Sequence, residues 1–424
     1  MKDLADITCL TVDYGTFLSL ADKMGEHVSR SLYYSPFEDE YRNARRCVVG
    51  SGIPNIERCD EWQDKIDEID LFIFPDIGYG GIQKYLRSIG KAVWGSMGAS
   101  DLELYRTRFL AKIEELGLPV APSVVVTGLT ALCDHLKGVK DRWIKVNRFR
   151  DNMETWHHID YDHSEPMLEW LAVEFGGVAD NIVFVVQDPI DNAQEVGYDG
   201  FCVDGQFPSK SFQGYEKKNQ LYLGTWLRDD QMPDDVKTVN AALAPYFKEI
   251  GYRNFFASEI RDKFFIDPTP RMAGQTQEHL LETCGNLADV IWHGANGVLL
   301  QPEFGAKFAA EATLHYTAGT DYWMVLKIPE EARQWVKLYN YCQEGDVYHF
   351  PPKKNDELGV VIGNGNTVLE AIDHLKANLE ALKTEPVKAH VEGFVDLIQE
   401  IEKAQKEGMT FSKKPLPEPA ELIS

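Results

Sequence analysis

The first hundred residues alternate short apolar runs with helical stretches, and each apolar run ends beside aspartate or glycine. The runs span residues 7–12, 71–74 and 92–94. Apolar strands separated by helices are typical of a parallel, doubly wound α/β sheet. Ligands of such sheets bind beyond the carboxyl ends of the strands. Segments 13–15 and 76–80 are therefore either substrate contacts or plain strand-end turns, and the sequence leaves both interpretations open.

The rest of the chain mixes helices and hairpins over a length of 424 residues, which is more than one hydrophobic core usually spans. We therefore expect several subdomains. Apolar residues at helical spacing predict helices. These helices span residues 101–116, 234–249, 276–293 and 368–382. Alternating residues predict a hairpin over 255–266, and we expect the last dozen residues, rich in Pro and Lys, to form a loose tail.

Composition excludes several classes of protein. A formal net charge of −24 disfavours direct binding of nucleic acid, and any site for a polyanion must gather its cations locally. The sequence has neither a membrane-length apolar stretch nor a signal-peptide pattern, so we expect a cytoplasmic location and no membrane partner. The seven cysteines are an odd number without close spacing, which is typical of reduced thiols.

The segment 257–271 carries the strongest chemical signal. Two strands meet at an Asp262-Lys263 turn, and Asp267, Thr269 and Arg271 recur at every second position, so they should share one face. Whether Glu259 joins them depends on the register of the hairpin, which the sequence leaves open. Carboxylates beside an arginine can hold Mg²⁺ and grip phosphoryl oxygens. The alternative is a solvated strand face with a surface ion pair.

In this segment the chain resembles the ATP-grasp superfamily, and within it most closely phosphoribosylamine–glycine ligase. The resemblance implies that Glu259, Asp267 and Thr269 form the magnesium site. It also implies that Arg271 contacts phosphate and that Arg271 or Arg261 stabilises the transferring phosphoryl group. Two departures stand out, because Asp267 replaces the usual Glu and Thr269 replaces a metal-binding Asn.

Two cations earlier in the chain match the nucleotide-binding positions of this superfamily. Arg106 follows a loop of small residues and precedes Gly117-Leu118-Pro119, and Lys145 lies within the apolar strand 143–146. Without the resemblance, each would be read as a surface residue. The family's glycine-rich loop after the lysine is replaced by a stretch that contains Arg148 and Arg150 but no glycine.

A later stretch resembles the interdomain linker, whose backbone reads the adenine edge. By this resemblance the adenine contacts are Gln187, Asp188, Pro189 and Ile190, and the ribose contact is Glu195. Lys210 is assigned as a further cation over the phosphates, with Lys217 and Lys218 as neighbouring candidates. A solvated basic hairpin is the alternative for at least two of these three lysines.

The resemblance predicts an α/β ATP-grasp fold built from five segments. These are an N-terminal doubly wound parallel-sheet domain at 1–98, a helical linker at 99–122, a lid at 123–195, a core at 196–330 and a small C-terminal subdomain at 331–424. It implies an ATP- and Mg²⁺-dependent ligase that joins a small-molecule carboxylate to an amine through an acyl phosphate, as in purine biosynthesis. A catalytically inactive nucleotide-binding protein and a sugar-nucleotide transferase are the alternatives, and a homodimer is left open.

Overall fold

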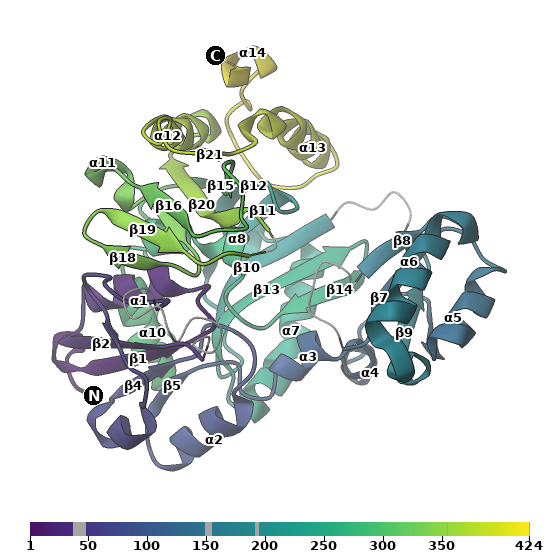
Figure 1. Cartoon of the computed structure of the whole chain (residues 1–424), viewed down its shortest axis with the longest axis horizontal. Helices are drawn as coiled ribbons and strands as arrows, with labels where there is room; N and C mark the ends of the chain where they lie inside the picture. Colours follow the sequence, from purple (N-terminus) through teal and green to yellow (C-terminus); the bar gives the residue numbers. More distant parts are fainter. Residues whose placement is uncertain (37–47, 149–154, 191–194, 354, 424) are drawn as a thin grey trace.

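The computed structural model of the chain describes residues 1–36, 48–148, 155–190, 195–353 and 355–423, and Figure 1 shows its arrangement. The described strands form four sheets. Among the described residues, no helix combines the length and the apolarity that crossing a membrane would require. The prediction for Arg150 lies outside the described residues.

The N-terminal sheet has five parallel strands in the order β3-β2-β1-β4-β5, which confirms the predicted doubly wound sheet. Its strands are β1 (Thr8–Val12), β2 (Arg30–Tyr34), β3 (Glu57–Arg58), β4 (Leu71–Ile73) and β5 (Ala92–Trp94). Helices α1 (Leu18–Gly25) and α2 (Gly80–Ser88) lie in its connections, with short 3-10 turns at Leu4–Asp6 and Gln63–Glu68. The strands β4 and β5 read as continuous apolar runs because they are buried on both faces.

The helix predicted over 101–116 is in fact two helices, α3 (Ser100–Leu104) and α4 (Arg106–Glu115). Tyr105 between them is extended, with φ −135° and ψ 99°. Asn147, which follows the strand Arg142–Val146, accounts for the break: its backbone oxygen accepts the Arg106 N–H at 3.1 Å, and its side chain accepts the Thr107 N–H at 2.9 Å. These contacts cap the second helix from outside its own sequence.

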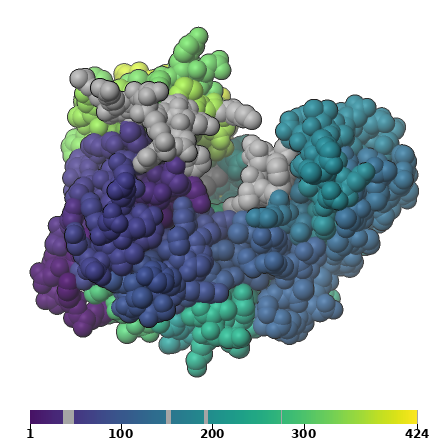
Figure 2. All heavy atoms as spheres, turned by 60° about the horizontal axis from the view of Figure 1, so that its bottom comes forward, coloured from purple at the N-terminus to yellow at the C-terminus, as the bar shows by residue number. Residues whose placement is uncertain are grey.

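A separate antiparallel sheet projects to one side of the molecule, and we call it the lid sheet (Figures 1 and 2). Its order is β6-β9-β7-β8. The strands are β6 (Ser123–Thr127), β7 (Arg142–Val146), β8 (Thr155–His158) and β9 (Val183–Gln187). Helices α5 (Leu129–Leu136) and α6 (Tyr161–Phe175) pack on it, and a 3-10 turn follows at Gly176–Asn181.

A nine-stranded sheet forms the body, with the order β14-β13-β10-β11-β12-β15-β20-β17 and β21 paired to β15. Its strands are β10 (Glu195–Val203), β11 (Lys210–Lys217), β12 (Leu221–Arg228), β13 (Arg253–Arg261), β14 (Phe264–Thr269), β15 (Phe308–Tyr316), β17 (Val336–Leu338), β20 (Glu357–Gly365) and β21 (Val387–Lys388). Helix α7 (Asp234–Ile250) packs on this sheet, preceded by a 3-10 turn at Asp229–Gln231. A backbone bridge between Gly95 and Arg253 joins the sheet to the N-terminal one.

The single helix predicted over 276–293 is wrong, because the chain forms three shorter helices there. They are α8 (Gly274–Gln277), α9 (Leu280–Thr283) and α10 (Leu287–Ala295). The backbone N–H of His279 donates at 2.8 Å to the buried carboxylate of Glu311, and Cys284 leaves the helix to bridge Phe304. Side chains from elsewhere in the body thus interrupt a pattern that is continuous in the sequence.

The C-terminal part adds a small three-stranded sheet and several helices. The strands are β16 (Met324–Lys327), β18 (Cys342–Glu344) and β19 (Val347–Phe350). The helices are α11 (Glu330–Arg333), α12 (Val368–Glu380), α13 (Phe394–Lys406) and α14 (Pro419–Ile423), with a 3-10 turn at Val391–Gly393. The tail predicted to be loose instead ends in α14, because Leu422 is buried against the C-terminal core.

Candidate functional site

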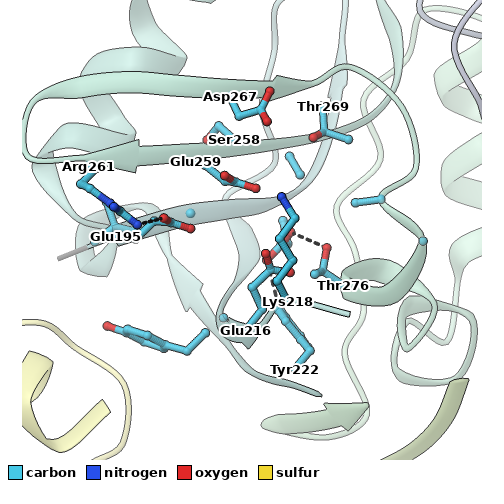
Figure 3. Close-up of a pocket in the computed structure, with 18 of the residues that line it drawn as sticks. Glu195, Glu216, Lys218, Tyr222, Ser258, Glu259, Arg261, Asp267, Thr269 and Thr276 are labelled. Carbon is cyan, nitrogen blue, oxygen red and sulfur yellow. Dashed lines mark hydrogen bonds and ion pairs between the residues drawn. The ribbon is translucent and has the colours of Figure 1, made fainter. Parts of the chain in front are cut away.

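A cavity of about 900 Å³ lies over one face of the body sheet (Figure 3). Its size is in the range of small-molecule sites. Alternate residues of the neighbouring strands make up much of its wall, as the period of a strand favours, and Val196, Tyr215 and Ser258 between them also line it. The strand residues on its wall include Glu195, Gly197, Asp199, Gly214, Glu216, Ala257, Glu259, Arg261, Asp267 and Thr269.

The β13–β14 hairpin answers the register question that the sequence leaves open. Glu259 lies directly opposite Asp267, and Ala257 lies opposite Thr269. A register shift follows between Glu259 and Ile260, so this facing arrangement applies to the part of the hairpin on the cavity wall. Residues opposite each other in an antiparallel pair share a face. Glu259 therefore joins Asp267 and Thr269 at one site.

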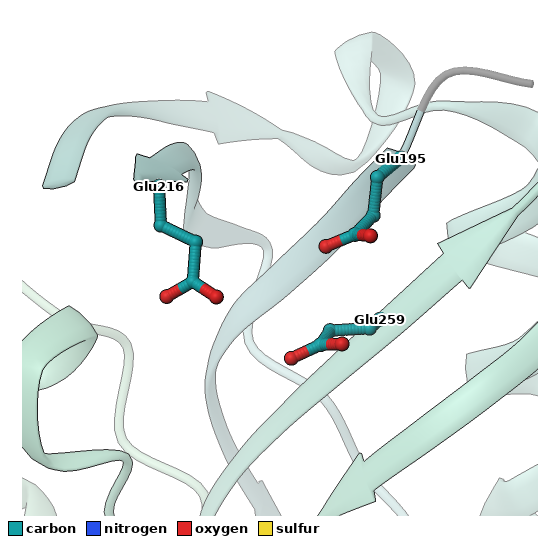
Figure 4. Close-up of side chains that lie close together, drawn as sticks. All are labelled: Glu195, Glu216 and Glu259. Carbon is teal, nitrogen blue, oxygen red and sulfur yellow. The ribbon is translucent and has the colours of Figure 1, made fainter. Parts of the chain in front are cut away.

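Three glutamates from adjacent strands converge beside this hairpin (Figure 4). Carboxylate oxygens of Glu195, Glu216 and Glu259 all lie within 4.8 Å of one another. Burial, followed by the charges of Asp267, Glu195 and Glu216, raises the pKa of Glu259 well above its ordinary value. Burial and Glu195 likewise raise the pKa of Glu216. Such repulsion is relieved by a cation, and carboxylate oxygens are the donors that Mg²⁺ prefers.

Asp267 is held by a cation from outside the sheet. Arg106, at the start of α4, donates to its Oδ1 at 2.6 Å, and the Arg106 side chain is only 7% exposed. Burial alone would raise the pKa of Asp267, but Arg106 and Lys145 hold it below its ordinary value. Asn147 directly follows β7 and caps α4, so Arg106 of α4 and Lys145 of β7 both act on the Asp267 carboxylate.

Lys145 is not on the described cavity wall, yet it is electrostatically coupled to it. Burial, followed by the charge of Arg106, lowers the pKa of Lys145 to about 8, while Asp267 and Glu259 act in the opposite direction. A cation desolvated in this way gains from a nearby polyanion. Lys145 therefore favours an anionic ligand at the end of the cavity nearest the lid.

Two further arginines on the wall are paired with carboxylates. The Arg271 Nη2 donates to Glu103 at 2.9 Å, its Nε lies 3.6 Å from Asp76, and the Glu103 side chain is 4% exposed. Arg261 donates to Glu195 at 2.7 Å (Figure 3). The Nε and Nη2 of Arg271 both donate to Glu103, and its Nη1 donates to the Met272 backbone oxygen, so the plane of the guanidinium is fixed.

The floor of the cavity holds a fifth strand carboxylate, Asp199. The Asp199 Oδ2 accepts the Tyr222 hydroxyl at 2.9 Å, and its Oδ1 accepts Thr276 at 3.4 Å. Burial, opposed by the Tyr222 hydrogen bond, raises the pKa of Asp199 to about 7. The Tyr222 ring stacks on buried His279, and a Cβ at Gly214 would overlap that ring. Glycine at position 214 therefore leaves room for the Tyr222 ring.

Most of the predicted site residues lie on this cavity wall. They are Arg106, Glu195, Glu259, Arg261, Asp267, Thr269 and Arg271. Lys210 is a correction: it begins β11 opposite Arg228 and lies over the Trp226 ring, at the other end of the strand from the cavity. Lys218, which follows the same strand, is the hairpin lysine on the wall, because hairpin register determines which of these basic residues reaches the site.

The predicted linker lies beside the cavity rather than on its described wall. Gln187 ends β9, Asp188 is paired with Arg142 at 3.0 Å, and Pro189 and Ile190 follow. The Asp188 backbone N–H donates to Pro122, so part of this backbone is already bonded to the start of the lid. Adenine contacts by these four residues stay a prediction.

Sequence reasoning missed several wall residues. Glu216, Asp199 and Tyr222 were not singled out, although Gly214, Glu216 and Lys218 alternate along one strand as wall residues do. Glu103 lies in α3, three positions before Arg106, but its partner Arg271 lies 168 positions away. Asp13 belongs to a strand-end turn. It is fully buried, and its carboxylate accepts hydrogen bonds from the N–H groups of Gly15 and Phe17.

Comparison with solved structures identifies the architecture. Phosphoribosylamine–glycine ligase from Thermotoga maritima matches with a TM-score of 0.66 over 91% of this chain and 98% of that chain, at 12% identity. The chain has the ATP-grasp fold. The biotin carboxylase domain of Hydrogenobacter thermophilus 2-oxoglutarate carboxylase, solved with MgADP and bicarbonate, matches with a TM-score of 0.61 at 12% identity, covering 98% of both chains.

A third ATP-grasp match is N5-carboxyaminoimidazole synthetase from Staphylococcus aureus, solved with ADP. Its TM-score is 0.60 at 12% identity, and the match covers 89% of this chain and 98% of that chain. No family model and no curated protein sequence matches the chain. At these identities the comparisons establish the ATP-grasp fold, and the residues of the cavity must carry any argument about its chemistry.

Proposed function

We propose that this chain is an ATP-dependent ligase that activates a carboxylate as an acyl phosphate and joins it to an amine. One observation carries the proposal: a single cavity collects the carboxylates of Glu259 and Asp267 with the guanidinium groups of Arg106 and Arg271. Oxygen ligands for a divalent cation and forks for phosphoryl oxygens are the two requirements of phosphoryl transfer. The three solved ATP-grasp neighbours include proteins bound to ADP, one of them with magnesium.

The donor set fits magnesium. Glu259 and Asp267 would hold the ion, with Thr269 on the same wall, and the crowded Glu195 and Glu216 carboxylates add oxygens nearby. Burial raises the pKa of Glu259, and repulsion from Asp267, Glu195 and Glu216 adds to it, so a bound cation would stabilise the charged carboxylate. When bound, Mg²⁺ neutralises charge on the phosphates.

The cations of the chain would orient the nucleotide. Arg106 and Lys145 converge on Asp267 from the linker and the lid, where they would exchange that carboxylate for phosphate oxygens. Arg271 would hold the transferring phosphoryl group, and the Arg261–Glu195 pair would flank it. Adenine contacts at Gln187–Ile190 and a ribose contact at Glu195 complete the proposal, although the Arg261 ion pair competes for Glu195.

The proposed chemistry has two steps. A substrate carboxylate oxygen attacks the γ-phosphorus and ADP leaves. The amine nitrogen then attacks the acyl carbon, inorganic phosphate leaves, and the nitrogen loses a proton. Asp199, whose pKa lies near 7, is placed on the cavity floor where it can hold a proton. Keeping water away from the acyl phosphate falls to the lid sheet over residues 123–187.

The best-supported substrate pair is glycine and phosphoribosylamine, on the strength of the Thermotoga maritima match together with the sequence resemblance. The test is an ADP-release assay with Mg²⁺-ATP, glycine and freshly generated phosphoribosylamine, followed by a panel of other amino acids and amines. We expect ADP release that requires both a carboxylate and an amine, with a product one water lighter than their sum.

The controls separate the alternatives. Glu259→Gln should abolish ADP release, whereas Glu249→Gln, exposed on α7, should not. ATP binding without ADP release across the whole panel would contradict the ligase and favour a nucleotide-binding protein, for which Thr269 in place of asparagine is the specific support. Tight binding of a nucleotide-sugar in preference to ATP would favour a transferase.

A further inference from the structure

A second cavity, of about 190 Å³, lies on the body away from the proposed active site, where the segment after α13 covers the ends of β12 and β15. Its interior is apolar: Leu227, Phe308 and Phe411 line it, and each is at most 3% exposed. An apolar cavity of about 150 Å³ can accommodate benzene, so this one has room for a single aromatic ring. We call it the tail cavity.

Three lysines surround the tail cavity: Lys307, Lys413 and Lys414. Among the described residues, no ion pair to a carboxylate is found for any of them. In a chain with a formal charge of −24, cations without acidic partners are unexpected, since carboxylates outnumber them. Nearby Arg228, by contrast, is paired with Asp230 at 3.0 Å.

Lys307 is the innermost of these cations. Its Nζ donates to the backbone oxygen of Trp226 and lies 3.9 Å above the centroid of the Trp226 ring. Lys210 also lies over that ring, at 5.3 Å. Burial, followed by the charges of Arg228 and Lys413, lowers the pKa of Lys307 to about 8. Two groups stabilise the charged form of Lys307, the Trp226 backbone oxygen and the Trp226 ring. The neighbouring charges of Arg228 and Lys413 are positive and act against it.

Hydrogen bonds and ring packing hold the segment that carries Lys413 and Lys414 in place. The Ser412 hydroxyl donates to the Lys414 oxygen at 2.9 Å, and the Gln405 side chain donates to the Ser412 oxygen at 2.8 Å. The Phe411 ring packs on Phe308 with centroids 5.8 Å apart. The lysine backbone is thus held at the mouth of the cavity before any ligand arrives.

We propose that the tail cavity binds a small organic anion with an aromatic or similarly compact apolar body. The apolar part would fill the space between Leu227, Phe308 and Phe411, and the anionic group would meet the three lysines. The proposal is independent of the ligase activity. Phe411 also packs on Tyr215, which lines the large cavity, so these two rings connect the walls of the two cavities.

The probes are phenylacetate and its uncharged counterpart phenylacetamide, titrated into the full chain and followed by ligand-observed NMR. We expect phenylacetate to bind with a Kd on the order of 1 mM, as its small size allows, and phenylacetamide to bind at least tenfold more weakly. Raising the salt concentration should weaken only the binding of phenylacetate, because the rim lysines are exposed and their charges are screened.

Lys413→Gln with Lys414→Gln is the decisive variant, because both side chains are exposed and we expect their replacement to leave the fold intact. We expect it to weaken phenylacetate binding at least fivefold, and the matched control Lys406→Gln, exposed at the end of α13, to leave it unchanged. Saturating ATP should not displace the probe. Equal binding of the two probes, no binding at all, or an unchanged affinity in the lysine variant would overturn the proposal.

Discussion

Arg106, the first residue of α4, donates a 2.6 Å hydrogen bond to Asp267, which lies 161 positions later on β14. The contact closes one end of the large cavity and neutralises a carboxylate that burial alone would leave unfavourable. Removing one member of a buried pair costs more than the pair contributes, because the other charge stays buried.

Arg106→Gln should therefore lower the free energy of unfolding by about 3 kcal/mol. The double variant with Asp267→Asn should recover most of that loss, because no charge is then left without a partner. Urea unfolding measures both. The control is Arg108→Gln, since Arg108 and its partner Asp101 are both exposed, and a shift within about 0.5 kcal/mol is expected there. Similar losses for Arg106→Gln and the control would contradict a buried pair.

Lys145 makes ATP binding depend on pH. Its folded pKa of about 8 lies below the ordinary lysine value, so above pH 8 the free protein carries a neutral Lys145. A bound triphosphate favours the charged form, and binding must then take up a proton. Between about pH 8.5 and 10 the affinity should fall about tenfold per pH unit, whereas below pH 8 this contribution is flat.

Calorimetry in buffers of different ionisation enthalpy measures this proton uptake directly. Lys145→Met should abolish the uptake at pH 9, and Lys140→Met, exposed just before the same lid strand, should retain it. Uptake that persists in Lys145→Met would show that another group titrates.

Arg271→Lys tests whether the guanidinium fork matters beyond its charge. Lysine keeps the positive charge beside Glu103 but cannot present two parallel N–H groups. We expect ADP release to fall about 100-fold, the size typical of losing one oriented donor to a transition-state oxyanion. The melting temperature should change little in comparison. Wild-type ADP release by the variant would contradict a contact between Arg271 and the transferring phosphoryl group.

Gly214→Ala should damage the floor of the cavity. A Cβ there would overlap the Tyr222 ring, which is fully buried, stacked on His279 and bonded to Asp199. Overpacking of this kind costs about 1–3 kcal/mol. Gly177→Ala is the matched control, because no atom lies within 4 Å of its added Cβ. Equal changes in melting temperature in the two variants would show that the Tyr222 ring can move aside to accommodate the added Cβ.

The sequence predicted those parts of the site that local patterns determine. Alternation in the β13–β14 hairpin placed Asp267 and Thr269 on one face, whereas Lys145 was singled out only through the resemblance to the ATP-grasp superfamily. The N-terminal parallel sheet followed from apolar runs that end in Asp or Gly. Each of these depends on residues close together along the chain.

What the sequence could not supply depends on distant partners. The helix break at Tyr105 is caused by Asn147, and the break before α9 coincides with the bond from His279 to Glu311. Which hairpin lysine reaches the cavity depends on strand register, so Lys210 was chosen where Lys218 lies on the wall. Periodicity carries no information about such contacts.

The most direct test of the account is calorimetric titration of ATP, with and without Mg²⁺, into the wild type, Glu259→Gln and the exposed control Glu249→Gln. Burial and neighbouring carboxylates already disfavour the charged form of Glu259, so the glutamine variant should fold at least as stably as the wild type. The account predicts magnesium-dependent ATP binding that Glu259→Gln weakens at least tenfold and Glu249→Gln leaves unchanged. No ATP binding under either condition would contradict it and leave only the fold.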